Sequence, residues 1–209
     1  ASLTDYLFLC RLQPMDTQSV SSFLEKQIDA VRSISENDEG RLKQAIDVLF
    51  GAGKIVVSGI GKSGHIGMKI ASSMTSLGAP AVFLHPAEAF HGDLGMIGKG
   101  DAVILLSHSG ETKEVIRLLV QIKRIGAEIV AVTGNGGSTL AKEAKAALTY
   151  RVTEEGSPYN IAPMASMTAM LAVGDLMATM LSVRRGYTAR DFAASHPGGS
   201  LGLQLTKVS

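Results

Sequence analysis

Short apolar runs rich in β-branched residues alternate with helical stretches through the middle of the sequence. The apolar runs lack a strict alternation of polar and apolar residues, as expected for strands that helices cover on both faces. Five runs have this character: KIVVSG, AVFL, DAVILLS, EIVAVTG and ALTYRV. Helical stretches are expected over 63–77, 112–125 and 138–144. The pattern predicts an α/β fold with a doubly wound, five-stranded parallel sheet.

Further helices are predicted on both sides of this sheet in the sequence. Apolar residues recur at helical spacing over 20–34 and 42–49, and a long Met-rich helix is expected over 164–185, before Gly186. A length of 209 residues favours a single domain with a sizeable core. Its parts are N-terminal helices in 1–50, the sheet core in 54–152 and a C-terminal helical segment in 153–209.

Composition and charge narrow the classes of partner and compartment. The net charge is only +1 and the basic residues are scattered, so neither nucleic acid nor a membrane is expected as a partner. Cys10 is the only cysteine, which excludes an internal disulfide and a cysteine pair for zinc. The N-terminal run YLFLC is too short to span a membrane and lacks a preceding basic region. We therefore expect a cytoplasmic protein.

The functional site is predicted at the carboxyl ends of the strands. In open parallel sheets, ligands bind in the crevice at this edge, where the strand order reverses. The segments that follow the five expected strands are 58–65, 85–95, 107–114, 133–138 and 153–163.

The first of these segments, VVSGIGKSGHIG, resembles two nucleotide-binding loops and satisfies neither fully. A phosphate loop of the Walker type needs glycine at the position of Val56. A dinucleotide site matches Gly59, Gly61 and Gly64, but no acidic residue follows the second strand before Glu88. Glycines that only make a tight strand-to-helix turn remain an alternative.

The segment SHSGETKE carries a stronger signal for phosphate. Ser107, Ser109 and Thr112 lie within one turn, Gly110 permits the bend, and a helix is expected to begin near Glu111. Hydroxyl groups and the free N–H groups of a helix N-terminus suit a phosphate monoester. An ordinary helix cap by Ser109 remains the alternative.

Acidic side chains and histidines accompany these loops. Four glutamates fall in the expected crevice, and Glu114, one turn beyond Ser109, is expected to face the same pocket. These glutamates are Glu111, Glu114, Glu154 and Glu155. The histidines are expected to gather at the same edge for acid–base chemistry. They are His65, His85, His91, His108 and His196. Their spacing fits no metal site, so neither a metal nor another cofactor is expected.

Four motifs in series resemble the sugar isomerase (SIS) domain of arabinose-5-phosphate isomerases. They run through 54–203 and read SGIGKSGHIGMKIA, HPAEAFHGDLGMI, LLSHSGETKE and DFAASHPGGSLG. The resemblance implies a flavodoxin-like SIS fold. In that family a pair of CBS domains usually follows the SIS domain, whereas this sequence stops at Ser209.

The resemblance also implies a set of site residues. The catalytic positions of the family match Lys62, His91, Glu114, Glu155 and His196. The substrate and phosphate positions are Ser58, Gly61, Ser63, Ser107, Ser109 and Thr112. Two departures stand out. His108 replaces a common asparagine, and Met164, Ala165 and Met167 replace three hydroxyl residues.

The expected activity is the interconversion of ribulose 5-phosphate and arabinose 5-phosphate through a cis-enediol. Glu155 is the expected base, Glu114 or His196 assists ring opening, Lys62 stabilises the enediolate, and His91 donates to a sugar hydroxyl. The family implies a homodimer or homotetramer, with histidines supplied by a neighbouring subunit. Two alternatives stay open: a SIS module that binds a sugar phosphate without turnover, and an isomerase of a hexulose 6-phosphate or an amino-sugar phosphate.

Overall fold

The computed structural model describes residues 17–198, and its centre is a five-stranded sheet in the order β2-β1-β3-β4-β5. Every neighbouring pair of strands is parallel. The strands are β1 (Ile55–Gly59), β2 (Ala81–Leu84), β3 (Ala102–Leu106), β4 (Glu128–Thr133) and β5 (Ala146–Thr149). The strand order reverses between β1 and β3. The predicted α/β fold with a five-stranded parallel sheet is confirmed.

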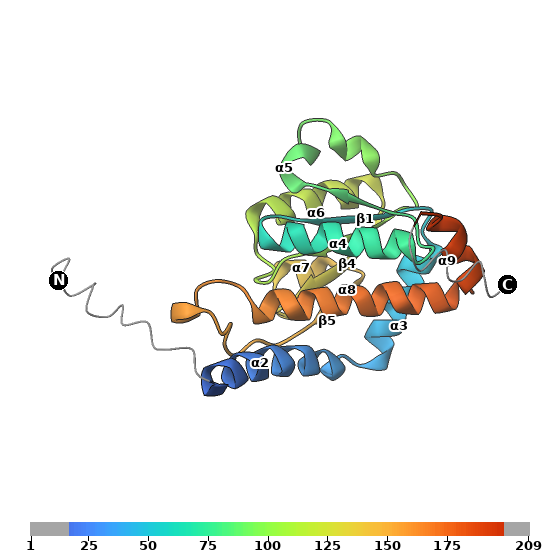
Figure 1. Ribbon diagram of the computed structural model, residues 1–209. Helices are drawn as coiled ribbons and strands as arrows, with labels where there is room; N and C mark the ends of the chain where they lie inside the picture. Colours follow the sequence, from blue (N-terminus) through green and yellow to red (C-terminus); the bar gives the residue numbers. More distant parts are fainter. Residues whose placement is uncertain (1–16, 199–209) are drawn as a thin grey trace.

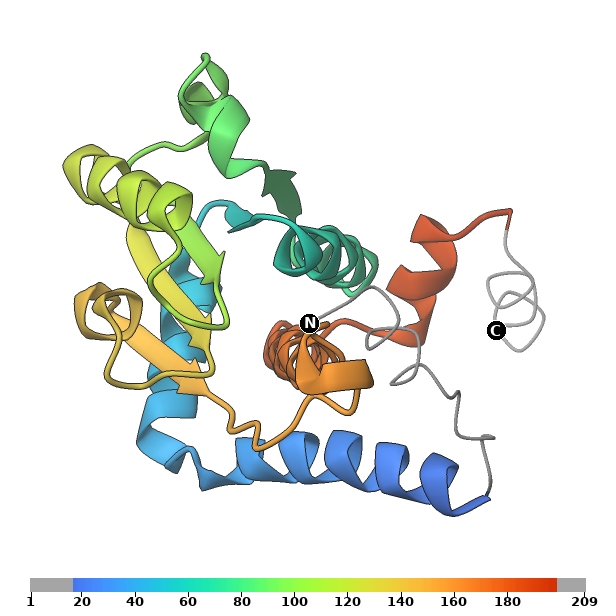
Figure 2. The same cartoon turned by 90° about the vertical axis from the view of Figure 1, so that its left-hand side faces the viewer.

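Helices cover both faces of this sheet, and α2 forms an outer layer against α8 (Figure 1). They are α2 (Thr17–Arg32), α3 (Glu39–Gly51), α4 (Lys62–Ser76), α5 (Pro86–Ala89), α6 (Lys113–Ile125), α7 (Thr139–Glu143), α8 (Ala165–Arg184) and α9 (Ala189–Ser195). Short 3₁₀ turns are η1 (Ser33–Glu36), η2 (Asp93–Met96) and η3 (Pro158–Asn160). Figure 2 looks along α8, which lies between α4 and α2. The parts of the predicted helical segments in 1–16 and 199–209, and Cys10, lie outside the described residues.

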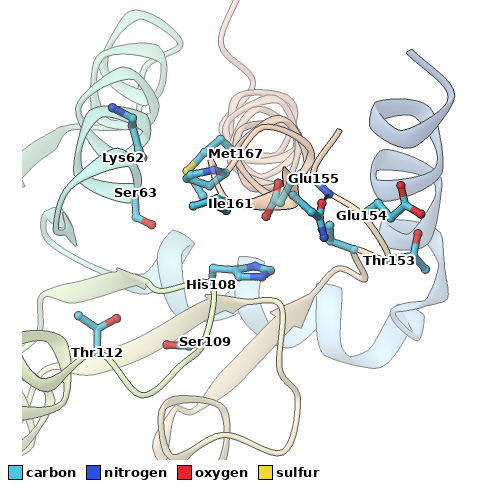
Figure 3. A pocket seen from close by; sticks show the side chains of 13 residues that line it. Lys62, Ser63, His108, Ser109, Thr112, Thr153, Glu154, Glu155, Ile161 and Met167 are labelled. Atoms are coloured by element: carbon cyan, nitrogen blue, oxygen red, sulfur yellow. Dashed lines mark hydrogen bonds between the residues drawn. The ribbon is translucent and has the colours of Figure 1, made fainter. Parts of the chain in front are cut away.

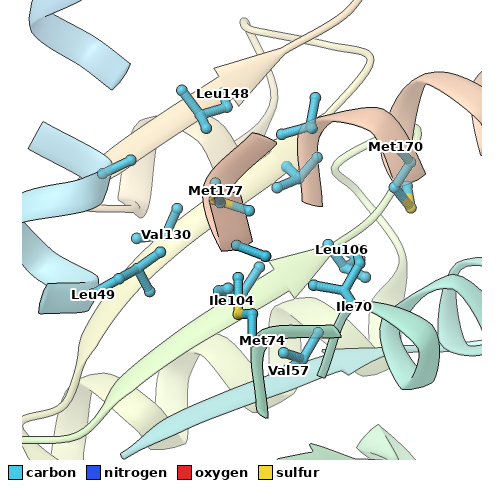
Figure 4. Packing of buried hydrophobic residues seen from close by; sticks show 14 of the residues in the cluster. Leu49, Val57, Ile70, Met74, Ile104, Leu106, Val130, Leu148, Met170 and Met177 are labelled. Carbon is cyan, nitrogen blue, oxygen red and sulfur yellow. The ribbon is translucent and has the colours of Figure 1, made fainter. Parts of the chain in front are cut away.

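Successive residues of each central strand pack into two different hydrophobic clusters. Val57 and Ile104 belong to the cluster that α3, α4 and α8 cover, shown in Figure 4. Val56 and Val103, their neighbours, belong to the cluster under α5, α6 and α7. Both sets are buried, which is why the strand sequences are apolar throughout.

Helix α8 is the central helix of the first cluster and packs closely on α4. At Gly174 an added Cβ would lie 2.3 Å from the side chain of Ile70, so only glycine allows this approach of the two helices. Among the described helices, α8 alone is long and apolar enough to cross a membrane by length and composition. Its buried face, including Met170 and Met177, contributes to the core of this fold.

The chain departs from the expected pattern at the end of the sheet and in two short helices. The sequence predicts a last strand over 147–152, but β5 ends at Thr149. Thr149 pairs with Thr133, the last residue of β4, and beyond it the amide of Arg151 donates to Ser33 Oγ of η1 at 2.7 Å. The helices α5 and α9 are not predicted by the sequence pattern. Because α8 runs back from the carboxyl edge of the sheet, α9 lies at the amino edge, where Tyr187 contacts Gly78.

Candidate active site

A pocket of about 540 Å³ opens at the carboxyl edge of the sheet, at the reversal of strand order. Three segments distant in the sequence line it. Lys62 and Ser63 come from the start of α4, and the loop after β3 supplies His108, Ser109 and Thr112. The third wall is the chain between β5 and α8, with Glu155, and the first turn of α8, with Met167. Figure 3 shows these three walls facing one another.

Close backbone approach shapes the loop after β1. Gly61 has φ +61° and precedes α4, and a Cβ on Gly64 would lie 2.8 Å from the carbonyl oxygen of Gly59. The glycines therefore hold the strand and helix together and bring Lys62 to the pocket in an exposed position. Neither nucleotide-loop pattern is needed to explain them. Ser58 lies behind this loop, and its fully buried Oγ has no hydrogen-bond partner within residues 17–198.

Hydrogen bonds between hydroxyl groups shape the loop after β3. Ser107 Oγ lies 2.8 Å from Thr112 Oγ1 and accepts a hydrogen bond from the amide of Gly110 at 3.1 Å. Gly110 has φ +69°, and a Cβ there would lie 2.1 Å from Ser138 Oγ. The turn therefore requires glycine and fixes two hydroxyl groups side by side.

The start of α6 answers whether these hydroxyls are a simple helix cap. The helix begins at Lys113, and its N-cap residue Thr112 makes no side-chain hydrogen bond to the helix backbone. Ser109 Oγ accepts from the amide of Glu111 at 3.2 Å, outside the helix. The alternative of an ordinary cap by Ser109 is therefore wrong. In the part of the chain that the structure describes, no side chain caps this helix end, so its first N–H groups are available to an anion.

Glu155 is held in place by the start of α8. Its side chain is mostly buried, with 9% exposed. One carboxylate oxygen accepts hydrogen bonds from the amides of Met164 and Ser166 at 2.8 and 2.9 Å. The amide of Glu155 donates to the side chain of Asn160, which itself has φ +56°. A carboxylate with fixed orientation and one remaining oxygen thus lies on the wall opposite the hydroxyl loop.

Two other glutamates of the crevice have structural partners. Glu111 accepts a hydrogen bond from the amide of Thr139 at 2.7 Å, and this bond holds the pKa of the Glu111 carboxyl below its ordinary value. Glu154 lines the pocket and pairs with Lys26 of α2 at 2.7 Å. These contacts explain both carboxylates without a role in chemistry.

Three of the predicted catalytic residues do not line this pocket in the described chain. Glu114 is exposed on the first turn of α6, and His91 is exposed after α5. His196 stacks on Phe192 with ring centroids 3.9 Å apart, beyond the far end of α8. In the single chain Glu114 is not among the residues that line the pocket, and its place in the site stays a prediction. Gly61 and the buried Ser58 and Ser107 shape the loops from behind, and Ser107 acts through Thr112.

The histidines do not gather as expected. All five lie within residues 17–198, and only His108 lines the pocket. His65 is exposed on α4, and His85 caps α5 by accepting from the amide of Ala87 at 3.3 Å. His196 lies at the amino edge because α8 carries the chain back across the sheet. Within the described residues no group of three or more His, Cys, Asp and Glu side chains is arranged to hold a metal ion.

Sequence reasoning missed several side chains of the third wall. These are Thr153, Asn160 and Ile161. Their segment follows the last strand, which marks its position in the crevice, but its internal turn is irregular. The sequence pattern treats His108 as one histidine among five, and the family resemblance marks it only as a replacement for a common asparagine. Its position between the hydroxyls of SHSGET was the available signal.

An open parallel sheet with a hydroxyl-rich helix start at its switch point defines a small-molecule-binding α/β protein. The profile of the SIS domain matches residues 48–180, and the chain belongs to the SIS domain family. It is 43% identical over 201 residues to the arabinose 5-phosphate isomerase KpsF of Escherichia coli O6:H1 (strain CFT073), covering 95% of this chain and 62% of that protein.

Two further comparisons agree. The arabinose 5-phosphate isomerase KdsD of Pseudomonas aeruginosa is 49% identical over 178 residues, covering 85% of this chain and 55% of that protein. A structure of an Escherichia coli CFT073 protein in complex with arabinose 5-phosphate superposes with a TM-score of 0.80 at 35% identity, covering 94% of this chain and all of that one. The chain thus spans between 55% and 62% of the length of these two curated relatives.

Proposed function

We propose that this protein is an aldose–ketose isomerase that interconverts ribulose 5-phosphate and arabinose 5-phosphate. The names of the curated relatives support this activity. The observation that carries it is the fixed carboxylate of Glu155 across one pocket from an uncapped, hydroxyl-bearing helix start. Such a pocket offers a base and a phosphate anchor to the two ends of one small molecule.

The phosphate binds at the start of α6. The hydroxyls of Ser109 and Thr112 donate to phosphate oxygens, and Ser107 orients Thr112 from below. The aligned peptide dipoles of the helix contribute typically about 0.3–1 kcal/mol to anion binding. Ser63 and Gly61, at the start of α4, close the site from the other side.

Proton transfer is the task of Glu155. Its carboxylate takes a proton from C1 of the open-chain ketose, which leaves a cis-enediolate with its negative charge on the C2 oxygen. The hydroxyl hydrogen of C1 then passes to the C2 oxygen through the cis-enediol, and return of the first proton to C2 gives the aldose. A positioned base of this kind contributes about 10² to 10⁴ in rate. Lys62 stabilises the negative charge that develops on the enediolate oxygens.

The remaining predicted residues act from another copy of the chain. The 20 residues of α8 separate its two ends by about 30 Å, so His196 cannot reach the pocket of its own chain. We propose a homodimer or homotetramer in which His91, Glu114 or His196 of a neighbour completes the site. Exposed apolar side chains on α2, such as Phe23 and Leu24, support such an interface. We place the enzyme in the cytoplasm, with no nucleic acid or membrane as partner.

The test follows solvent deuterium into the product. Ribulose 5-phosphate in D₂O should give arabinose 5-phosphate labelled at C2, and Glu155→Gln should slow this labelling by about 10² to 10⁴. Glu128→Gln is the matched control, because Glu128 is exposed at the amino edge of the sheet. No labelling by the wild-type protein, or unchanged labelling by Glu155→Gln, would remove the proposed base.

A second candidate is a SIS module that binds a sugar phosphate without turnover. The apolar side chains of Ile161 and Met167 on the third wall favour it, since neither can hydrogen-bond to a sugar hydroxyl. Saturable binding of several sugar phosphates with no isomer formed would support this candidate. Assaying a hexulose 6-phosphate and an amino-sugar phosphate for isomer formation distinguishes an isomerase of one of these substrates from the proposed pentose-phosphate isomerase.

A further inference from the structure

His108 and Tyr150 form a hydrogen-bonded pair at the base of the pocket. The Nδ1 atom of His108 lies 3.1 Å from the phenolic oxygen of Tyr150. The two rings are stacked, with centroids 5.7 Å apart and planes inclined by 23°. Tyr150 is 3% exposed and follows β5, whereas His108 follows β3, so the pair bridges the carboxyl end of β4.

The backbone fixes the position of this imidazole. The carbonyl oxygen of His108 accepts hydrogen bonds from the amide of Gly134 at 2.9 Å and from Thr133 Oγ1 at 3.2 Å. The ring packs directly on Gly134, where a Cβ would lie 2.6 Å from His108 Nδ1. The backbone is therefore held, and the exposed ring is oriented from one side by Gly134 and Tyr150.

The buried phenol determines which ring nitrogen carries the hydrogen. Burial and the nearby charge of Glu155 raise the pKa of the Tyr150 hydroxyl, so this group keeps its hydrogen. Among the described residues, His108 Nδ1 is the hydrogen-bond partner of the phenolic oxygen. A buried hydroxyl needs an acceptor, and an imidazole nitrogen without hydrogen supplies one. In the neutral ring, the hydrogen is then on Nε2.

We propose that His108 is a sugar-contacting residue that donates its Nε2–H to a substrate oxygen between the phosphate anchor and Glu155, with Tyr150 as the positioning residue that sets this tautomer. Figure 3 shows the His108 ring extending into the pocket between Ser109 and Glu155. This inference rests on the proposed function, because the donor is useful where charge develops on an enediolate oxygen.

The donor complements Lys62 from the opposite wall of the pocket. Lys62 starts α4, on one side of the cavity, and His108 rises from the sheet edge on another. A donor that is already oriented needs no reorganisation when charge appears on the substrate, which is the condition for strong stabilisation of a transition state. His108 thereby has a task that neither Lys62 nor Glu155 performs.

The experiment combines nitrogen NMR with kinetics. In protein labelled with ¹⁵N and observed at pH 8, the His108 shifts should report the Nε2–H tautomer, and arabinose 5-phosphate should move the Nε2 resonance. Tyr150→Phe should convert this signal into a mixture of tautomers and lower kcat about 10-fold with little change in KM. His108→Ala should lower kcat about 100-fold, and His108→Gln, which retains a donor, should recover part of it.

Tyr187→Phe is the matched control. Its hydroxyl also bonds one side chain, Ser195 Oγ at 2.9 Å, but at the amino edge of the sheet. This variant should leave the His108 tautomer and kcat unchanged. A change equal to that of Tyr150→Phe would assign the effect to general loss of a tyrosine hydroxyl and overturn the proposal.

The outcomes separate this inference from the proposed function. A wild-type Nδ1–H tautomer, or full kcat in His108→Ala, overturns the donor role. The NMR measurement needs no variant, so a misfolded variant does not weaken it. A wild-type protein that forms no isomer, while arabinose 5-phosphate still moves the Nε2 resonance, overturns the isomerase and supports the sugar contact.

Discussion

The two loops at the switch point reach the same pocket by opposite means. The shape of the loop after β1 depends on glycine, which has no Cβ: Gly64 allows the backbone of α4 to approach the carbonyl of Gly59. The loop after β3 is shaped by added hydroxyls, since Ser107 bonds both Thr112 and the amide of Gly110. The first loop therefore sets a distance and exposes one cation, whereas the second supplies the hydroxyl groups that we propose as the phosphate anchor.

Replacing the exposed cation tests the first loop most sharply. Lys62→Ala should lower kcat/KM by about 10² to 10³, because the variant loses the charge that we propose stabilises the enediolate. The melting temperature should stay close to that of the wild type, because the Lys62 side chain is exposed. Steady-state kinetics and thermal unfolding check both parts. Lys99→Ala, an exposed lysine in the turn before β3, is the control that should keep its activity. A large fall in melting temperature for Lys62→Ala would make this lysine structural.

Adding one methyl group to the first loop tests whether distance is its function. Gly64→Ala should lower the free energy of unfolding by about 1–3 kcal/mol, because the new Cβ meets backbone that cannot move away freely. Urea unfolding measures this. Gly51→Ala, where an added Cβ meets nothing within 4 Å, is the same substitution at an open position and should change stability by less than about 1 kcal/mol. Equal effects at both glycines would contradict the close-approach argument.

The hydroxyls of the second loop should divide between stability and binding. Ser107→Ala removes a buried hydroxyl with two partners and should cost about 0.5–1.5 kcal/mol of unfolding free energy. Ser109→Ala removes an exposed hydroxyl and should leave stability unchanged while raising KM for the sugar phosphate several-fold. Urea unfolding and KM, measured on both variants, decide this. A stability loss in Ser109→Ala together with a raised KM and unchanged stability in Ser107→Ala would contradict this prediction.

The buried phenol behind the second loop predicts a difference in alkaline stability. The pKa of Tyr150 is raised in the folded state, first by burial and then by Glu155. Its contribution is complete below the unfolded pKa near 10 and is lost as pH rises above that value, because only the unfolded state releases the proton there. Up to about 1.4 kcal/mol of unfolding free energy should disappear per pH unit in that range. Tyr150→Phe should flatten the decline, and parallel curves for both proteins would contradict it.

The local sequence pattern was sufficient to predict the sheet and most helices. It also contained start signals for α5 and α9, which were not predicted. The strands are apolar because both faces are covered, so their positions follow from the sequence. Pro86 directly after His85, and Thr188 three residues before Asp191, are start signals of the two short helices that were not predicted. β5 ends opposite the last residue of β4, and the next chain segment bonds Ser33, more than a hundred residues away; no local pattern in the sequence of β5 indicates either partner.

The residues of the candidate site likewise include some that the sequence predicts and some that it does not. Ser109 and Thr112 were predictable because a loop after a parallel strand points to the crevice. The anchoring of Glu155 was not, because it depends on amides nine and eleven residues later at the start of α8. His196 shares a family motif with the site, yet the length of α8 moves it to the opposite edge. Sequence motifs thus identify the chemical groups, whereas the fold determines which of these groups lie in the same pocket.

Gly174, at the crossing of α4 and α8, connects the two helices that position Lys62 and Glu155 on two of the three walls of the pocket. Lys62 begins α4, Glu155 is fastened to the first amides of α8, and the two helices touch at Gly174. The spacing between lysine and carboxylate is thus set partly in the core, far from any ligand. Laboratory evolution that selects only for heat resistance and changes this crossing will therefore also change the width of the pocket.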